Sequence, residues 1–173
     1  MTINSLKMTA RLQAVEVGPN DFGGPVFSPD MLQVIELTNG TGADQADILW
    51  MDERTLATGT SVDLDLNGVL TDAFGGTISA LELVALFVIN APRSGVANTT
   101  NLTIGGGTNP ITGYLGGTTP TIGPIRPGSF VFLGSSNAAG FGAIVAGTGD
   151  ILRITNSAGA SATFQIAIVA RSA

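Results

Sequence analysis

The chain has 173 residues, of which 44% are hydrophobic and only 12% are charged. An ordinary globular domain carries about 25% charged residues, so the surface has few charges for one domain of this length. The formal net charge is −6, with no His and no Cys, which excludes disulfides, thiolate and imidazole chemistry, and argues against the clustered cations that bind nucleic-acid phosphates.

The N-terminal segment shows the alternation of a β-strand. Apolar residues at positions 6, 8, 10, 12 and 14 alternate with polar ones, which predicts a half-buried strand over Leu6–Ala14. The segment Gly18–Pro25 is rich in Gly and Pro and predicts a long loop. A second strand is expected over Met31–Thr38, ended by Asn39–Gly42.

The middle of the chain holds the most apolar segment. Alternation predicts strands over Ala46–Trp50 and Val62–Leu66, with Asn67-Gly68 as a hairpin turn after the second. For Ile78–Asn90, the start at Ala80–Leu83 allows a helix. The β-branched and aromatic residues that follow favour a central, buried strand, with Leu83–Ile89 at its centre.

The last third of the chain predicts further short strands separated by Gly-rich loops. The strands are expected at Asn101–Ile104, Ser129–Leu133, Ile151–Thr155 and Ala162–Ala170, and the loops at Thr108–Thr121 and Gly134–Gly142. About eight short strands without an amphipathic helix predict an all-β fold, an antiparallel β-sandwich or barrel, of which we expect the sandwich. We expect a single domain over residues 1–173, in which residues 1–25 form an N-terminal strand or arm with its loop.

One stretch resembles half of a calcium-binding loop. Asp63, Asp65 and Asn67 place side-chain oxygens at alternate positions before Gly68, but Phe74 stands where the loop needs a bidentate Glu. The alternative is an amphipathic strand whose two aspartates face water, and this alternative is preferred. The sequence leaves open whether these three residues bind calcium.

Other candidate sites are weaker. Asp52-Glu53, beside Arg54, predicts a solvated turn rather than an acid pair across a cleft. Gly105–Gly107 predicts a tight turn, because the Lys of a phosphate-binding loop is missing. The sequons at Asn98 and Asn101 are expected to be fortuitous. Among the aromatics, Trp50 is predicted to lie in the core and Tyr114 to be exposed for contact. We therefore assign no catalytic residue, no cofactor site and no metal site.

Two stretches resemble small jelly-roll structural proteins of tailed-phage particles. The first covers Val62–Thr77 with its Asp-Leu-Asp-Leu-Asn-Gly-Val-Leu-Thr run, and continues through Ala85–Asn90 and Asn101–Gly105. The second begins with Arg126-Pro-Gly-Ser and includes Ala146–Asn156. The resemblance covers somewhat more than half of the chain. It implies a jelly-roll sandwich, a homotrimer and a place in the virion, without an enzyme site.

The sequence thus predicts a non-enzymatic virion protein, made in the host cytoplasm and placed on the capsid surface. Its expected partners are the major capsid protein and further copies of itself, with no nucleic acid and no membrane. The preferred function is capsid decoration (cement). The alternative is host recognition from the tail or a head spike, in which the loops at 105–121 and 134–142 contact a glycan receptor. The N-terminus lacks the basic and apolar regions of a secretion signal, and the longest apolar run, Leu83–Ile89, is too short to span a bilayer.

Overall fold

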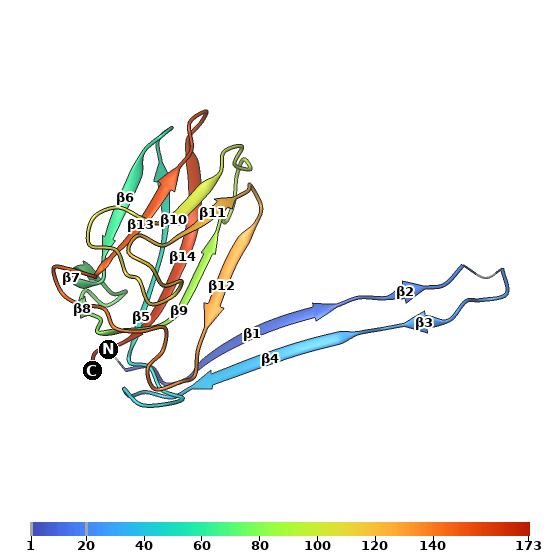
Figure 1. The fold of residues 1–173 in the computed structure, drawn as a ribbon, viewed down its shortest axis with the longest axis horizontal. Coiled ribbons are helices and arrows are strands. Elements are labelled where there is room, and N and C mark those ends of the chain that lie inside the picture. Colours follow the sequence, from blue (N-terminus) through green and yellow to red (C-terminus); the bar gives the residue numbers. More distant parts are fainter. Residues whose placement is uncertain (1, 20) are drawn as a thin grey trace.

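The computed structural model describes residues 2–19 and 21–173 and shows an all-β protein (Figure 1). Most of the chain forms a β-sandwich, from which a long β-hairpin projects. The described residues contain no helix long and apolar enough to cross a membrane. The strands are β1 (Leu6–Gln13), β2 (Glu16–Val17), β3 (Val26–Phe27), β4 (Asp30–Leu37), β5 (Ile48–Leu56), β6 (Ser61–Asp65), β7 (Asn67–Thr71), β8 (Thr77–Ser79), β9 (Glu82–Ile89), β10 (Leu102–Gly105), β11 (Thr121–Ile125), β12 (Phe130–Gly134), β13 (Ile151–Asn156) and β14 (Ala162–Arg171).

Two four-stranded antiparallel sheets form the sandwich. One has the strand order β11-β10-β13-β6 and the other β12-β9-β14-β5. Because successive side chains of a strand point to opposite faces, each strand sends alternate residues between the sheets. These residues make one continuous apolar core, which includes the fully buried Leu64, Leu86, Leu102, Ile104, Leu152, Ile154, Phe164 and Ile168. The antiparallel β-sandwich expected from the sequence is confirmed.

Strand β9 is an inner strand, as its apolar run predicted. It pairs with β12 on one side and with β14 on the other. Leu86 and Val88 belong to the core between the sheets, whereas Val84 and Ala85 belong to a second apolar cluster on the outside of the sheet. The sheet is therefore covered on both faces near the start of β9. This double burial explains why the segment is apolar without alternation.

The first two predicted strands lie outside the sandwich. β1 and β4 pair along their whole length, from Leu6 opposite Leu37 to Gln13 opposite Asp30, and β2 and β3 continue the same register to Val17 opposite Val26. Together they form one ribbon, residues 6–37, which we call the arm (Figure 1). The predicted loop at 18–25 is its tip, where the Gly18 amide donates to the Pro25 carbonyl at 3.0 Å; within this loop, Asn20 lies outside the described residues.

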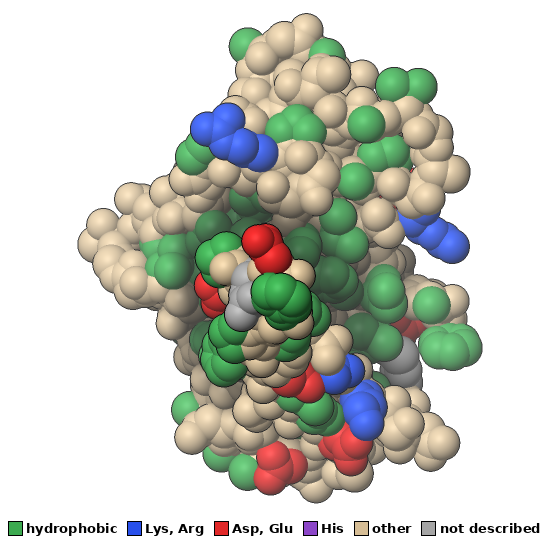
Figure 2. Space-filling view, turned by 90° about the vertical axis from the view of Figure 1, so that its right-hand side faces the viewer, with side chains coloured by type: hydrophobic (Ala, Val, Ile, Leu, Met, Phe, Trp, Pro, Cys, Tyr) green, Lys and Arg blue, Asp and Glu red, His purple; other side chains and the backbone are tan. Residues whose placement is uncertain are grey.

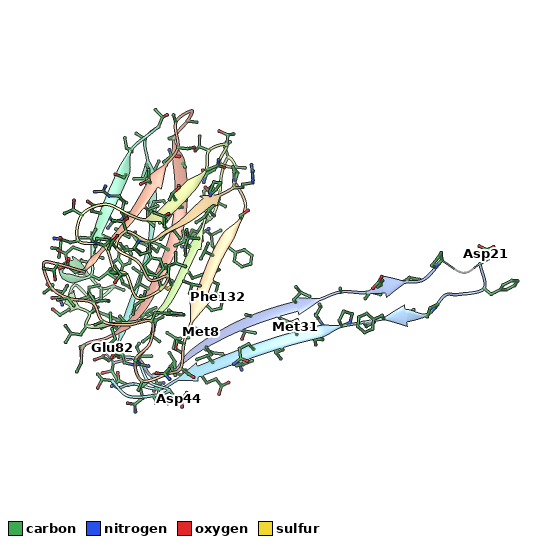
Figure 3. All side chains as sticks on the ribbon, in the orientation of Figure 1. Met8, Asp21, Met31, Asp44, Glu82 and Phe132 are labelled. Carbon is green, nitrogen blue, oxygen red and sulfur yellow. The ribbon has the colours of Figure 1, made fainter. Side chains whose placement is uncertain are left out.

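The root of the arm packs on the outside of the β12-β9-β14-β5 sheet. Met8 and Leu37 are buried there, and Phe132 of β12 packs against the same cluster. Figure 3 shows Met8 and Phe132 close together at the root, whereas Met31 lies farther out along the arm and Asp21 at its far end. The half-buried strand predicted over Leu6–Ala14 is therefore half-buried only at its start.

A buried arginine ties the segments around the root together. Arg171 is fully buried; its Nε donates to the Gln45 carbonyl at 2.9 Å, and its two Nη atoms donate to the Ala138 and Asn137 carbonyls at 2.6 and 2.9 Å. Its Nη1 also contacts a carboxylate oxygen of Glu82 at 3.0 Å. Arg171 thus links the end of β14 to the start of β9, to the segment between the arm and β5, and to the loop that contains Asn137 and Ala138.

Two local predictions are wrong. Asn67-Gly68 is not a hairpin turn: β7 begins at Asn67 and pairs with β8, and the turn between them lies at residues 72–76. There the Asp72 carboxylate accepts hydrogen bonds from the Phe74 and Gly76 amides, which closes the turn and lowers the pKa of Asp72. Asp52-Glu53 is also not a turn, because β5 runs through both residues to Leu56.

The position of Arg171 generates a stability prediction. Arg171→Met preserves much of the side-chain volume but leaves three carbonyls and Glu82 without their donor, and we expect a loss of about 3–5 kcal/mol in the free energy of unfolding. Arg153→Met removes the exposed pair with Asp63, whose oxygens lie 2.6 Å and 2.7 Å from the guanidinium, and should cost less than about 1 kcal/mol. Chemical denaturation measures both; equal losses would contradict the role given to Arg171.

Candidate interaction surface

The arm has two faces of different chemistry, because successive residues of each strand point to opposite sides. The register assigns them. What we call the inner face carries Leu6, Met8, Ala10, Leu12, Ala14, Glu16, Phe27, Pro29, Met31, Gln33, Ile35 and Leu37. The outer face carries Lys7, Thr9, Arg11, Gln13, Val15, Val17, Val26, Ser28, Asp30, Leu32, Val34 and Glu36.

The near half of the arm is apolar on one face only. On its outer face Lys7 pairs with Glu36 at 2.9 Å, and Arg11 pairs with Asp30 at 2.7 Å. The inner face of this half rests on the sandwich at its root. An amphipathic ribbon usually has water on its polar face and protein on its apolar face. The near half of the arm is in this situation.

The far half of the arm, residues 12–17 and 26–32, carries large apolar side chains on both faces and exposes them. Its large apolar side chains are between 54% and 72% exposed: Leu12, Val15, Val17, Val26, Phe27, Met31 and Leu32. Figure 2 looks at the arm end-on and shows hydrophobic side chains around its tip. Soluble monomers rarely expose a contiguous apolar surface of this kind, and such surfaces mark sites of association.

A groove lies where the arm leaves the sandwich. Its volume is about 570 Å³, with β1 as one wall and the outside of the β12-β9-β14-β5 sheet as the other. The sheet contributes Leu49, Met51, Ala85, Phe87, Phe130, Phe132, Ala167 and Val169, and the arm contributes residues 6–11. We call this groove the wedge. The hydrophobic side chains in the recess behind the arm are visible in Figure 2.

The aromatic residues of the wedge pack against one another edge to face. The Phe87 ring meets Phe132 edge-on at 5.3 Å between centroids and Phe130 at 6.0 Å. Phe130 and Met51 remain 65% and 67% exposed. The wedge is thus open to solvent at Phe130 and Met51, although its lining is mostly apolar.

Charged residues without an ion pair stand at the ends of these two surfaces. Within the described part of the chain, Glu16 and Asp21 near the arm tip make no ion pair, and neither do the guanidinium groups of Arg93 and Arg126. Arg93 lines a depression that adjoins the wedge through Met51 and Phe87, and Arg126 lines another beside Phe130. The arm tip is therefore acidic. The far rim of the wedge carries two arginine side chains without an ion pair, and Asp52 and Glu53 line the same depression as Arg93.

The calcium-like stretch does not converge on one point. Asp63 pairs with Arg153, whose hydrogen bonds lower the pKa of that carboxyl. Asp65 accepts the backbone amide of Asn67 at 2.8 Å, and the Asn67 side chain donates to the Ala80 carbonyl at 3.0 Å. No cluster of three or more acidic side chains placed to hold a metal occurs among the described residues.

The other singled-out residues have structural partners. Asp52 pairs with Arg54 at 2.7 Å, while Glu53 accepts the Arg93 backbone amide at 2.6 Å. The Asn98 side chain donates to the Thr163 carbonyl at 2.6 Å and accepts the Thr163 amide at 3.0 Å, which fixes the loop before β10 to β14. At Gly105, with φ of 91°, a side chain would collide with the Pro120 carbonyl, so this position supports the tight turn.

The two aromatic predictions have opposite outcomes. Trp50 lies in the core, 4% exposed, as expected. Tyr114 was expected to be exposed but is 7% exposed and belongs to the same core, so that prediction is wrong. Its loop folds back on the sandwich because Ile111 is buried and its amide bonds the Ile151 carbonyl at 3.1 Å. Burial raises the pKa of Tyr114.

Sequence reasoning did not find the wedge. Its walls come from five strands far apart in the chain, and no local pattern reports which strands share the outside of a sheet. One signal for the arm was present: both predicted N-terminal strands flank a Gly- and Pro-rich loop, the arrangement of a hairpin. Comparison with family models, with curated proteins and with solved structures gives no match to this chain.

The Tyr114 hydroxyl is buried and has no hydrogen-bond partner among the described residues. Tyr114→Phe removes that polar atom and keeps the ring, so we expect the free energy of unfolding to stay the same or to rise by about 1 kcal/mol. Tyr114→Ala removes the ring and should cost about 3–5 kcal/mol. Thermal or chemical unfolding tests this pair; a loss above about 1 kcal/mol for Tyr114→Phe would show that the hydroxyl is bonded.

Proposed function

We propose that this protein is a non-enzymatic structural protein of a bacteriophage particle, most specifically a capsid decoration (cement) protein that binds the major capsid protein and stabilises the shell. The observation that carries the proposal is the arm. A ribbon that leaves the sandwich with apolar side chains on both faces is suited to bury surface against other proteins. The phage assignment itself rests on the resemblance at Val62–Thr77 and from Arg126 onward.

The order of the sandwich strands supports the jelly-roll part of this proposal. The eight strands in chain order are β5, β6, β9, β10, β11, β12, β13 and β14, and they divide between the sheets as β12-β9-β14-β5 and β11-β10-β13-β6. In one sheet the first and last of the eight strands, β5 and β14, lie side by side. In the other sheet the second and the seventh, β6 and β13, lie side by side. We infer that this is the double Greek key of a jelly roll, an architecture common in viral capsid proteins.

The edges of the arm support attachment to a shell. Each strand of a two-stranded ribbon has one edge that is not paired within the described chain. Such an edge offers backbone donors and acceptors to an extended segment of another protein, the β-augmentation mode of recognition. Since the arm reaches well beyond the sandwich (Figure 1), its edges are accessible to a neighbouring protein while the sandwich remains outside the contact.

A structural role fits the chemistry of the chain better than catalysis. With no His, no Cys and one Lys, the reacting groups left are carboxylates and hydroxyls. Three of the candidate carboxylates already have partners. Asp52 and Asp63 form ion pairs, and Glu53 accepts a hydrogen bond from a backbone amide. We infer that the protein acts by binding.

The rival function, recognition of a host glycan from the tail or a head spike, needs the two Gly-rich loops to present side chains outward. Ile111 and Tyr114 of the first loop are buried. The second loop is held by Arg171 through the Asn137 and Ala138 carbonyls, and its Phe141 amide bonds the Leu83 carbonyl at 2.7 Å. These contacts favour decoration over glycan binding.

Imaging of intact virions that carry a labelled copy of the protein tests this function. We expect label across the icosahedral faces, and particles that burst more easily when the protein is absent. Replacing residues 14–29 by an Asn-Gly turn shortens the arm while leaving the sandwich intact, and should abolish decoration. Val69→Asp, at an exposed position of β7 away from the arm, is the control and should decorate normally. Label confined to the tail tip would refute the cement function.

A further inference from the structure

We propose that copies of this chain associate by arm exchange: the far half of the arm of one copy, residues 12–17 and 26–32, seats in the wedge of another copy. The association concerns the isolated protein as well as the particle, so it does not depend on the capsid function. It also gives a physical mode for the homo-oligomer expected from the sequence resemblance.

The occupant of the wedge meets apolar side chains on two sides. A segment in the wedge meets the apolar outside of the sheet on one side and β1 on the other, where half of the lining residues are apolar. The near half of the arm cannot serve, because Lys7, Arg11 and Glu36 make its outer face polar. The far half carries Leu12 and Met31 on its inner face and Val15, Val17 and Leu32 on its outer face, so it has apolar side chains for both walls. Asp30, its one ionised residue on the outer face, is held by Arg11 of the same arm.

The lengths of the two surfaces also agree. Six residues of extended strand, such as 12–17, span about 20 Å. On the sheet, the outward-facing run of β9 from Ala85 to Ile89 spans about 16 Å by the same rise per residue. A second copy's far half therefore covers the exposed sheet surface and extends slightly past it, to the rim where Arg93 lies.

The unpaired charges then find partners. Glu16 and Asp21 lie at the end of the arm that reaches this rim, and Arg93 and Arg126 lie beside the depressions that continue the wedge. The acidic tip of one copy can therefore pair with these two arginine side chains of another copy. Charge complementarity of this kind fixes register and suppresses wrong partners more than it adds affinity, and it points to a second copy rather than to an unrelated apolar segment.

The chain's own arm does not fill its own wedge. The ladder from Leu6 to Val17 keeps one register without a bulge, and neither arm strand contains a glycine at which the ribbon folds back. Residues 6–11 already form the near wall of the wedge, so the far half lies beyond its reach. Each copy thus has one exposed apolar ribbon and one open groove. If the rotation that relates neighbouring copies closes into a ring, the exchange yields a finite oligomer.

Sedimentation velocity on the purified full chain, over a range of concentrations, tests the exchange with two variants and a control. Val17→Asp places a charge on the far half of the arm, and Met51→Glu places one on the sheet wall of the wedge. Val69→Asp is the control, since Val69 and Met51 are both 67% exposed and Val17 is 63% exposed. All three positions face solvent in the single chain, and circular dichroism checks that each variant is folded.

We expect the wild type and Val69→Asp to form the same closed oligomer, and both other variants to raise the dissociation constant at least about tenfold. Mixing Val17→Asp with Met51→Glu should restore part of the association, because the intact arm of one fits the intact wedge of the other. A monomeric wild type at all concentrations would overturn the proposal. Unchanged association in both variants would overturn it as well, as would a mixture no more associated than its components.

Crosslinking separates exchange from closure of the arm on its own sheet. The chain has no cysteine, so the double variant Val17→Cys/Met51→Cys provides the only two thiols for a short bismaleimide. Exchange predicts covalent dimers and higher multimers on a denaturing gel, formed at concentrations where the protein is associated. Monomers with an internal crosslink, or no crosslink at all, would contradict it.

Discussion

The arm carries apolar side chains over a longer distance than the sandwich covers, and the rest of the account depends on this constraint. An isolated two-stranded ribbon is at best marginally stable in water, because it buries little apolar surface for the backbone entropy it loses. The near half overcomes this by packing Met8 and Leu37 on the sheet. The far half has no such support within the described chain, so its order and its exposure favour a state in which another surface covers it.

The sandwich supplies the rigid base from which the arm projects. Its core is complete without the arm, because the two four-stranded sheets bury their inward residues against each other. The root is then fixed by polar contacts: Arg171 bonds the Gln45 carbonyl, and the Asp44 amide bonds the Ser136 carbonyl at 2.9 Å. Segments that belong to different parts of the chain therefore hold one direction for the arm, which limits the entropy lost when it binds.

Sequence patterns predicted two kinds of strand: those with one buried and one exposed face, and those with both faces buried. β9, β13 and β14 are all at the expected places because their apolar pattern is set by the core. β11 was missed: Pro124 lies inside it and usually argues against a strand, but β11 is at the edge of its sheet, where a proline is tolerated. Asp52-Glu53 was misread because β5, at the edge of its sheet, can carry both residues, one of them paired with Arg54.

The candidate surface was less predictable than the fold. Alternation over Leu6–Ala14 predicts that one side of the strand is apolar. It does not predict whether that side contacts its own domain or another chain. Tyr114 was misplaced for a similar reason, since a Gly- and Thr-rich loop gives no local sign that it folds back onto the core. The low charge content favours a surface that is partly covered by partners, but it does not indicate which part of the surface.

Amide hydrogen exchange of the arm in the free and the assembled protein shows whether another chain covers its far half. If the far half is an association element, amides of residues 12–17 and 26–32 exchange rapidly in dilute monomer and slow markedly on assembly, while those of β9 and β14 are protected in both states. Equal exchange of the far half in both states would contradict it.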